Sequence, residues 1–168
     1  MLNLILDCYL RFMIIYRKAT AQDMDQVYGL IIELAVYERE PDAVTITPAD
    51  LIQHGFVDGK FECFVAEDSE TSSLVGMALF YPRYSTWKGP TLHLEDLYIK
   101  QEMRGRNIGD ELFKRVAKVA AERGVGRMEW SVLEWNEPAL NFYKKHDANL
   151  DPEWHQGTLT RKDLERYL

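Results

Sequence analysis

Residues 92–99, Leu-His-Leu-Glu-Asp-Leu-Tyr-Ile, alternate between apolar and polar side chains and are rich in strand formers, which predicts a β-strand. Runs of the same kind predict further strands elsewhere in the chain. They cover residues 14–17, 61–67, 74–84, 127–133 and 154–159. The polar residues 68–73 are expected to turn the chain between two of these strands.

Helical spacing of apolar residues follows the strand at 92–99. Leu112, Phe113, Val116 and Ala120 recur every three or four residues, which predicts an amphipathic helix beginning close to Gly109. Capping residues predict the other helices. They run from Thr20 to about Tyr37, from Thr47 to about Gly55, from Asn136 through Pro138 onward, and from Thr160 onward. This order of elements predicts an α+β fold in which helices cover a mixed sheet.

The segment between the strand at 92–99 and its following helix has the composition of an anion-binding loop. At a helix N-terminus, backbone N–H groups and the positive end of the helix dipole point toward one place. Arg104 and Arg106 add positive charge there. The nucleotide-binding patterns Gly-x-Gly-x-x-Gly and Gly-x-x-x-x-Gly-Lys-Ser/Thr are absent from the sequence. The loop therefore predicts a phosphate site of another kind.

Length and composition limit the possible architectures and partners. A chain of 168 residues with 46% hydrophobic residues and no Pro/Gly/Ser-rich linker predicts one domain with a buried core. The formal charge of −7 disfavours nucleic acid as a partner; it either keeps the protein in solution or attracts a cationic substrate. The two cysteines, Cys8 and Cys63, indicate neither a disulfide framework nor a zinc site and fit a reducing, cytoplasmic compartment. No metal site is predicted.

Residues 1–12 differ in composition from the rest of the chain. They are mostly apolar, with Asp7 and Arg11 as interruptions. They lack the basic start and the cleavage site of a signal peptide, and they are too short to span a membrane. They are either a short packing extension or a segment before the true start at Met13. We therefore expect an extension at 1–12, a single domain at 13–168 and no membrane association.

The loop resembles motif A of the GNAT superfamily of N-acetyltransferases, Arg/Gln-x-x-Gly-x-Gly/Ala, which holds the diphosphate of coenzyme A. Arg104 and Gly109 match this motif, whereas Asn107 stands where the family usually has glycine. Because asparagine adopts left-handed backbone angles more readily than other non-glycine residues, we expect weakened or slightly changed cofactor binding, not its loss. The run from Asn136 to Tyr143 resembles a second family motif, Asn-x-x-Ala…Phe-Tyr.

The resemblance implies the fold and the acetyl donor of the family. The fold would be a mixed, mostly antiparallel central sheet flanked by helices, and the cosubstrate would be acetyl-CoA. The residues that correspond to coenzyme A contacts are Leu97, Tyr98, Ile99, Arg104, Gly105, Arg106, Asn107, Ile108, Gly109, Asp110 and Asn136. Backbone groups of residues 97–99 would hold the acetyl and pantetheine groups.

Longer shared motifs narrow the resemblance to the diamine N-acetyltransferases of the spermidine/spermine and thialysine types. These are Arg17-x-Ala-Thr-x-x-Asp23, Leu94-Glu-Asp96 and Glu134-Trp-Asn-Glu-Pro138. The subfamily implies a small di- or polyamine, or a thialysine-like amine, as acceptor, and a homodimer. Its substrate-lining residues correspond to Tyr37, Glu38, Trp87, Glu95 and Glu153. Ser85 replaces an acidic residue of the subfamily, so an anchor for a distal ammonium group is missing.

Acetyl transfer to an amine needs a base and an acid. A primary ammonium group, with a pKa of about 10.4, must lose a proton before it attacks, and the departing thiolate must gain one. The resemblance supports Glu95 as the base, acting directly or through an ordered water, and Tyr143 as the acid. From the residues alone, Glu95 is also compatible with an ion pair on a solvated strand face, and Tyr143 with a packed side chain whose hydroxyl is satisfied.

Two further functions stay open on the sequence. One is a non-catalytic acyl-CoA-binding regulatory module, with which the departures at Asn107 and Ser85 are compatible and which the retained Glu95, Asn136 and Tyr143 oppose. The other is a protein or peptide N-acetyltransferase.

Overall fold

The structure is a computed structural model that describes residues 13–154 and 156–168. The chain forms two compact units, which meet in sequence between Ser131 and Val132. The predicted extension at residues 1–12 lies outside the described residues. Within the described ranges, no helix is long and apolar enough to cross a membrane.

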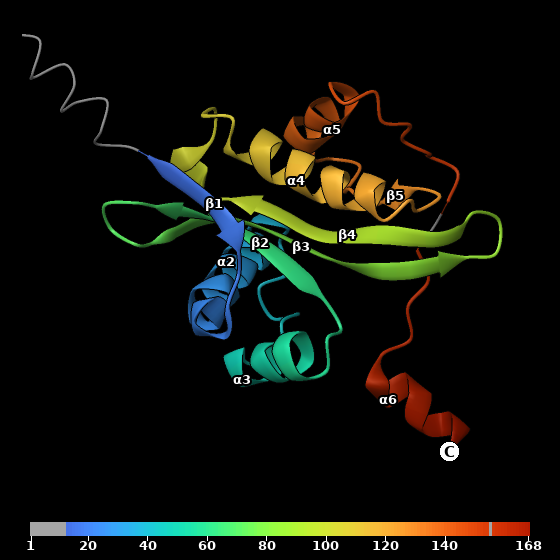
Figure 1. The fold of residues 1–168 in the computed structure, drawn as a ribbon. Coiled ribbons are helices and arrows are strands. Elements are labelled where there is room, and N and C mark those ends of the chain that lie inside the picture. Colours follow the sequence, from blue (N-terminus) through green and yellow to red (C-terminus); the bar gives the residue numbers. More distant parts are fainter. Residues whose placement is uncertain (1–12, 155) are drawn as a thin grey trace, which may run out of the picture. The chain divides into compact units, whose positions relative to one another are not determined.

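The first unit is built on one mixed sheet. The strands are β1 (Ile14–Lys18), β2 (Glu62–Asp68), β3 (Leu74–Ser85), β4 (Gly89–Ile99) and β5 (Met128–Glu129). Among the described residues they pair in the order β1-β2-β3-β4-β5, and each pair is antiparallel except β4 with β5, which is parallel (Figure 1). The predicted mixed, mostly antiparallel sheet is confirmed.

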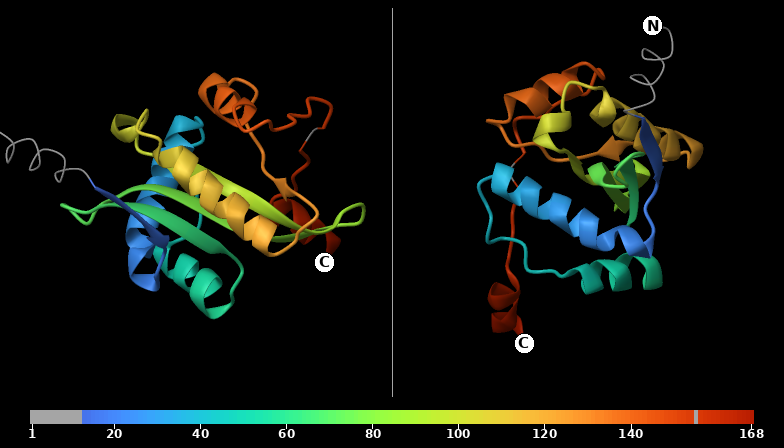
Figure 2. Two further views of the ribbon diagram at one scale, coloured as in Figure 1. Left: turned by 45° about the horizontal axis from the view of Figure 1, so that its top comes forward. Right: turned by 90° about the vertical axis from the view of Figure 1, so that its left-hand side faces the viewer.

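Helices cover both faces of this sheet. One face carries α2 (Met24–Tyr37), which follows the 3-10 turn η1 (Ala21–Asp23), and α3 (Pro48–Ile52), which continues into the π turn η2 (Gln53–Val57) (Figures 1 and 2). The other face carries α4 (Ile108–Glu122), preceded by the 3-10 turn η3 (Gln101–Met103). The apolar side predicted for this helix, including Leu112, Phe113 and Val116, is buried. The α+β prediction is therefore correct.

The core under α2 is formed by apolar side chains of both layers. The helices contribute Met24, Val27, Leu30 and Leu51, and the sheet contributes Cys63, Val65, Leu74, Met77, Leu79 and Tyr98. Burying each large apolar side chain stabilises the fold by roughly 1.5–3 kcal/mol. Burial also raises the pKa of the Cys63 thiol to about 12, which makes this cysteine unreactive at neutral pH.

The strand predicted over 127–133 is much shorter in the structure. Two residues before it, Gly126 passes so close to the hairpin that a Cβ atom there would collide with the carbonyl oxygen of Lys88. Pairing with β4 ends at Glu129. Trp130 then sets its ring against the edge of Phe113 on α4, with the centroids 5.4 Å apart. The chain thus leaves the sheet after Glu129, at the point where the indole of Trp130 packs on the helix.

The second unit contains α5 (Glu137–Lys144), α6 (Arg161–Leu164) and the 3-10 turn η4 (Glu165–Tyr167). Asn136 caps α5 as predicted, since its side chain accepts a hydrogen bond of 3.3 Å from the Ala139 N–H. Asp147, which follows α5, takes the left-handed conformation with φ of 55°. The strand predicted over 154–159 is wrong, because the described residues there are exposed and form no strand pairing.

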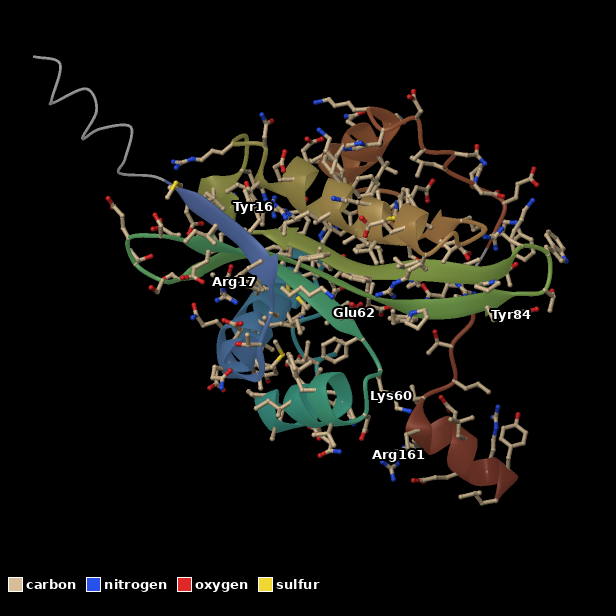
Figure 3. All side chains as sticks on the ribbon, in the orientation of Figure 1. Tyr16, Arg17, Lys60, Glu62, Tyr84 and Arg161 are labelled. Carbon is tan, nitrogen blue, oxygen red and sulfur yellow. The ribbon has the colours of Figure 1, made fainter. Side chains whose placement is uncertain are left out.

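The motif Arg17-x-Ala-Thr-x-x-Asp23 forms an ion-pair clamp in the first unit. The guanidinium of Arg17 donates to both carboxylate oxygens of Asp23 at 2.7 Å and to Glu67 at 2.8 Å. Asp23 also accepts hydrogen bonds from the N–H and hydroxyl of Thr20. Arg17 thus joins β1 to β2 and to the start of α2 (Figure 3 labels it). The hydrogen bonds from Arg17, and then those from Thr20, lower the pKa of Asp23 to about 2.

We predict that Asp23→Asn lowers the free energy of unfolding by about 1–3 kcal/mol at pH 7, because it weakens the hydrogen bonds to Arg17 and removes the ion pair. The folded pKa of about 2 lies below the ordinary value of 3.8, so this stabilisation is complete above pH 4 and is lost as the pH falls toward 2. Denaturant unfolding at pH 7 and pH 2.5 measures both effects. Asp25→Asn, at an exposed position of α2, is the control. An equal difference at both pH values would contradict the clamp.

Candidate active site

A β-bulge in β4 places the predicted base. Leu94 pairs with Phe80 and Asp96 pairs with the preceding residue of β3, Leu79, so Glu95 is an extra residue without a partner of its own. Such a bulge bends a strand locally and redirects its side chains. The bulge lies between the β3–β4 hairpin and the loop that follows Ile99.

The bulge reverses which side chains of β4 face the helix α2. Before it, Leu92 and Leu94 are buried, and His93 pairs with Tyr81. After it, Asp96 and Tyr98 pair with Leu79 and Met77, which belong to the core under α2. Because residues two apart on β3 share a face, His93, Asp96 and Tyr98 lie on the α2 side of the sheet.

Glu95 lies on the same side. The hydroxyl of Tyr81 donates a hydrogen bond of 2.8 Å to Glu95 Oε2, and His93 Nε2 is 3.6 Å from that oxygen. Half of the Glu95 side chain, 50%, is exposed. The bulge therefore turns two consecutive carboxyl groups, Glu95 and Asp96, toward the α2 side.

Asp96 is a site residue that the sequence analysis did not assign. Burial, and then the neighbouring carboxylates of Glu95 and Glu38, raise its pKa to about 7. Glu38 follows the last residue of α2, and burial raises its pKa as well. The structure thus brings Glu38, predicted to line the acceptor site, together with Glu95 and Asp96. The signal in the sequence was a pair of polar residues between Leu94 and Leu97, where strict alternation would place one.

The loop after β4 has the backbone of a helix-terminal anion site. Gly105 and Asn107 both take left-handed angles, with φ of 78° and 61°. Asn107 precedes α4, and its carbonyl accepts the first helical bond, from Glu111 N–H at 3.1 Å. The N–H groups of Ile108 and Gly109 come before that donor, so they are not part of the helical ladder. Asn107 thus adopts a left-handed backbone angle, which the sequence analysis expected asparagine to allow.

Arg104 is held within the first unit. Its Nε donates to the carbonyl oxygen of Ile99 at 3.1 Å, and its guanidinium lies 4.7 Å from the ring centroid of Tyr37 and 5.7 Å from that of Tyr98. The positive charge predicted at this position is thus held by one hydrogen bond and two aromatic rings. Arg104 instead ties the loop to Tyr37, the last residue of α2 and a predicted substrate-lining residue.

The edge of β4 that faces β5 is open beyond His93. β5 pairs with Leu92 and His93, and none of the described residues continues that pairing along β4. The backbone of residues 97–99, predicted to hold the acetyl and pantetheine groups, lies on this unpaired stretch. Lys100 follows it and approaches Glu33 at 3.8 Å.

Trp87, the other acceptor-lining residue predicted in the first unit, does not lie in this cluster. Trp87 is 77% exposed in the β3–β4 turn. The strand β4 begins after that turn at Gly89, about 20 Å from Glu95 at about 3.3 Å per residue. The hydroxyl of Ser85 accepts bonds from the N–H groups of Trp87 and Lys88 at 3.2 and 3.3 Å, so Ser85 shapes that turn.

The second unit carries the other predicted residues. Tyr143 lies on α5, where its ring meets that of Phe142 with centroids 5.2 Å apart, and Asn136 caps the same helix. Glu153 follows in an exposed segment. The roles assigned to these three residues stay predictions. Among residues 13–154 and 156–168, no group of three His, Cys, Asp or Glu side chains is placed to hold a metal ion.

Comparison with solved structures supports the fold. An integron cassette protein from Vibrio cholerae superposes with a TM-score of 0.74 at 21% identity and covers 92% of this chain and 96% of its own. An aminoglycoside acetyltransferase from an uncultured soil metagenomic sample gives a TM-score of 0.71 at 19% identity, over 88% and 97% of the two chains.

Comparison with curated sequences identifies the relatives. The bovine (Bos taurus) thialysine N-epsilon-acetyltransferase is 38% identical over 152 residues, which is 84% of this chain and 89% of the relative. The human (Homo sapiens) spermidine/spermine N(1)-acetyltransferase-like protein 1 is 36% identical over 157 residues, covering 88% of this chain and 23% of that protein. Residues 24–148 match the acetyltransferase (GNAT) family. The chain is an N-acetyltransferase and belongs to the GNAT family, whose enzymes use acetyl-CoA.

Proposed function

We propose that this enzyme transfers the acetyl group of acetyl-CoA to a primary amine of a small di- or polyamine or of a thialysine-like amine. The names of its relatives support this acceptor class. The observation that carries the proposal is the bulge of β4, which gathers Glu38, Glu95 and Asp96 at one end of α2. Such a group of carboxyl side chains suits an acceptor with one ammonium group to react and another to bind.

On the donor side, the loop after β4 would hold the diphosphate of coenzyme A. The N–H groups of Ile108 and Gly109, with the positive end of the α4 dipole, favour an anion there. No heavy atom outside its neighbours lies within 4 Å of a Cβ position built on Gly105, so that part of the loop is open to a ligand. Arg106 and Asp110 flank it. The pantetheine arm would run along the edge of residues 97–99 that β5 leaves unpaired, and Asn136 is its predicted contact in the second unit.

The proposed transfer balances in protons and bonds. Glu95 takes a proton from the substrate ammonium, and the neutral nitrogen attacks the thioester carbonyl carbon. The carbon–sulfur bond breaks, and Tyr143 gives its proton to the leaving thiolate, which a phenol of pKa about 10 can do for a thiol of pKa about 8.5. The nitrogen, which still carries one proton too many for an amide, releases that proton to solvent. Solvent restores both side chains. Asp96 would attract the ammonium group.

We further propose a cytoplasmic homodimer, as the resemblance to diamine N-acetyltransferases implies. A buried, unreactive Cys63 fits the reducing compartment of this proposal.

An acetylation assay with a panel of amines, read by mass, tests the proposal. The enzyme should acetylate diamines in preference to lysine peptides. Glu95→Gln should lower kcat by about 10²- to 10⁴-fold, and Tyr143→Phe by about 10- to 10⁴-fold, because each loses a proton-transfer group. Glu122→Gln, an exposed glutamate of α4, is the matched control. Full activity of Glu95→Gln would show that Glu95 is not the base. A preference for peptides would show that the acceptor is a peptide and not a small amine.

A second prediction concerns Asn107. Asn107→Ala should weaken coenzyme A binding by roughly 3- to 10-fold in calorimetry, because alanine pays about 1 kcal/mol or more for a left-handed angle. Asn107→Gly takes that angle without cost and should bind as tightly as the natural chain or more tightly. If the alanine and glycine variants bound coenzyme A equally well, the backbone angle at residue 107 would not determine the affinity for coenzyme A.

A third prediction concerns the pH dependence that Asp96 causes. Its folded pKa of about 7 lies above the ordinary 3.8, so the native state binds the proton more strongly and loses stability as the pH rises from about 4 through 7. Asp96→Asn has no charge to bury, so it should be about 1–3 kcal/mol more stable than the natural chain at pH 8.5 and no more stable at pH 4. Denaturant unfolding at both pH values measures this. An equal difference in the free energy of unfolding between the two proteins at both pH values would contradict a buried charge on Asp96.

A further inference from the structure

The carboxylate of Glu95 is held by one of its two oxygens. Tyr81 donates its hydroxyl to Oε2 at 2.8 Å, and His93 Nε2 lies nearest to that same oxygen, at 3.6 Å. None of the described residues forms a hydrogen bond or ion pair with Oε1. One oxygen is therefore anchored, and the other is left to a partner from outside.

His93 supports the Tyr81 ring. The two residues are direct partners across β3 and β4, and their ring centroids are 5.2 Å apart with planes inclined by 36°. The His93 side chain is 13% exposed, and Nδ1 is buried without a hydrogen-bond partner among the described residues. An imidazole in this position acts through its packing surface.

The charge state of His93 agrees with such a role. Burial is the main cause that lowers its pKa, and the groups that face it are Tyr81, Arg83, Glu95 and Glu129. The ring is therefore neutral at neutral pH and does not compete with a substrate ammonium for Glu95. Burial, and then the bond to Glu95, raise the pKa of Tyr81 to about 12, so its hydroxyl keeps its proton and stays a donor.

We infer that Tyr81 is a positioning residue for Glu95. Its hydroxyl fixes Oε2 of Glu95, so that Oε1 meets the substrate ammonium, and the ring of His93 packs against Tyr81 and holds it in place. This rests on the proposed role of Glu95 as base. A half-exposed glutamate has several rotamers, and restricting them before the substrate arrives avoids the loss of side-chain entropy at the reaction step. The expected gain is about tenfold in rate.

Steady-state kinetics with a diamine test this inference. Tyr81→Phe should lower kcat by about 5- to 50-fold and leave both KM values within about twofold, since neither substrate is bound by the lost hydroxyl. Tyr84→Phe is the matched control: it lies on the same strand, is 73% exposed, and is labelled at the end of the hairpin in Figure 3. An unchanged kcat of Tyr81→Phe, or a loss confined to KM, would overturn the inference.

Two variants of His93 distinguish the packing of its ring against Tyr81 from a role of its imidazole nitrogens. His93→Phe keeps a flat ring under Tyr81 and should retain kcat within about threefold. His93→Ala removes the ring and should lower kcat as Tyr81→Phe does. Equal activity of the two variants, whether high or low, would show that ring packing is not the function of His93. Thermal unfolding of each variant confirms that it is folded.

A double variant distinguishes this inference from the proposed function. In the Glu95→Gln background, Tyr81→Phe should cause no further loss, because the group that it positions is gone. If Glu95→Gln were fully active, the base assignment would fail; if it were inactive while Tyr81→Phe kept full kcat, only the positioning role would fail. NMR of ¹³Cζ-labelled tyrosine adds a test without turnover: the Tyr81 signal should move in Glu95→Gln and not in Glu122→Gln. An unmoved signal would overturn the hydrogen bond.

Discussion

The extra residue in β4 is the constraint on which the acceptor side depends. Without the bulge between Leu94 and Asp96, consecutive residues would point to opposite faces, and Glu95 and Asp96 would be separated by the sheet. With it, both carboxyl groups lie on the α2 side, near Glu38 at the end of that helix. Burial, and then repulsion from the carboxylates of Glu95 and Glu38, account for the raised pKa of Asp96.

The same strand leads directly to the donor side. β4 ends at Ile99, whose carbonyl holds Arg104, and the loop then turns through Gly105 and Asn107 into α4. Because Arg104 also lies on the ring of Tyr37, the loop is linked to the end of α2 that carries Glu38. One strand thus relates the two halves of the proposed reaction: its bulge would orient the acceptor groups, and the helix terminus that follows it would face the phosphate.

Much of this arrangement could be read from the sequence. The caps at Asn136 and Thr160 and the apolar side of α4 depend only on residues close together in sequence, and the structure confirms them. The length of β5 could not be read, because Trp130 leaves the strand to pack on Phe113, a contact between residues far apart in sequence. The residues at 154–159 have strand propensity but no partner strand among the described residues. Asp96 was missed because a bulge depends on the register with β3, which no single strand reveals.

Amide hydrogen exchange, followed by mass spectrometry with and without coenzyme A, tests most directly whether β4 and its loop form the donor site. The account predicts slower exchange in peptides that cover residues 97–110, where backbone N–H groups meet the cofactor, and little change over residues 62–80. Saturating coenzyme A that left residues 97–110 unprotected, or that protected only residues 62–80, would contradict it.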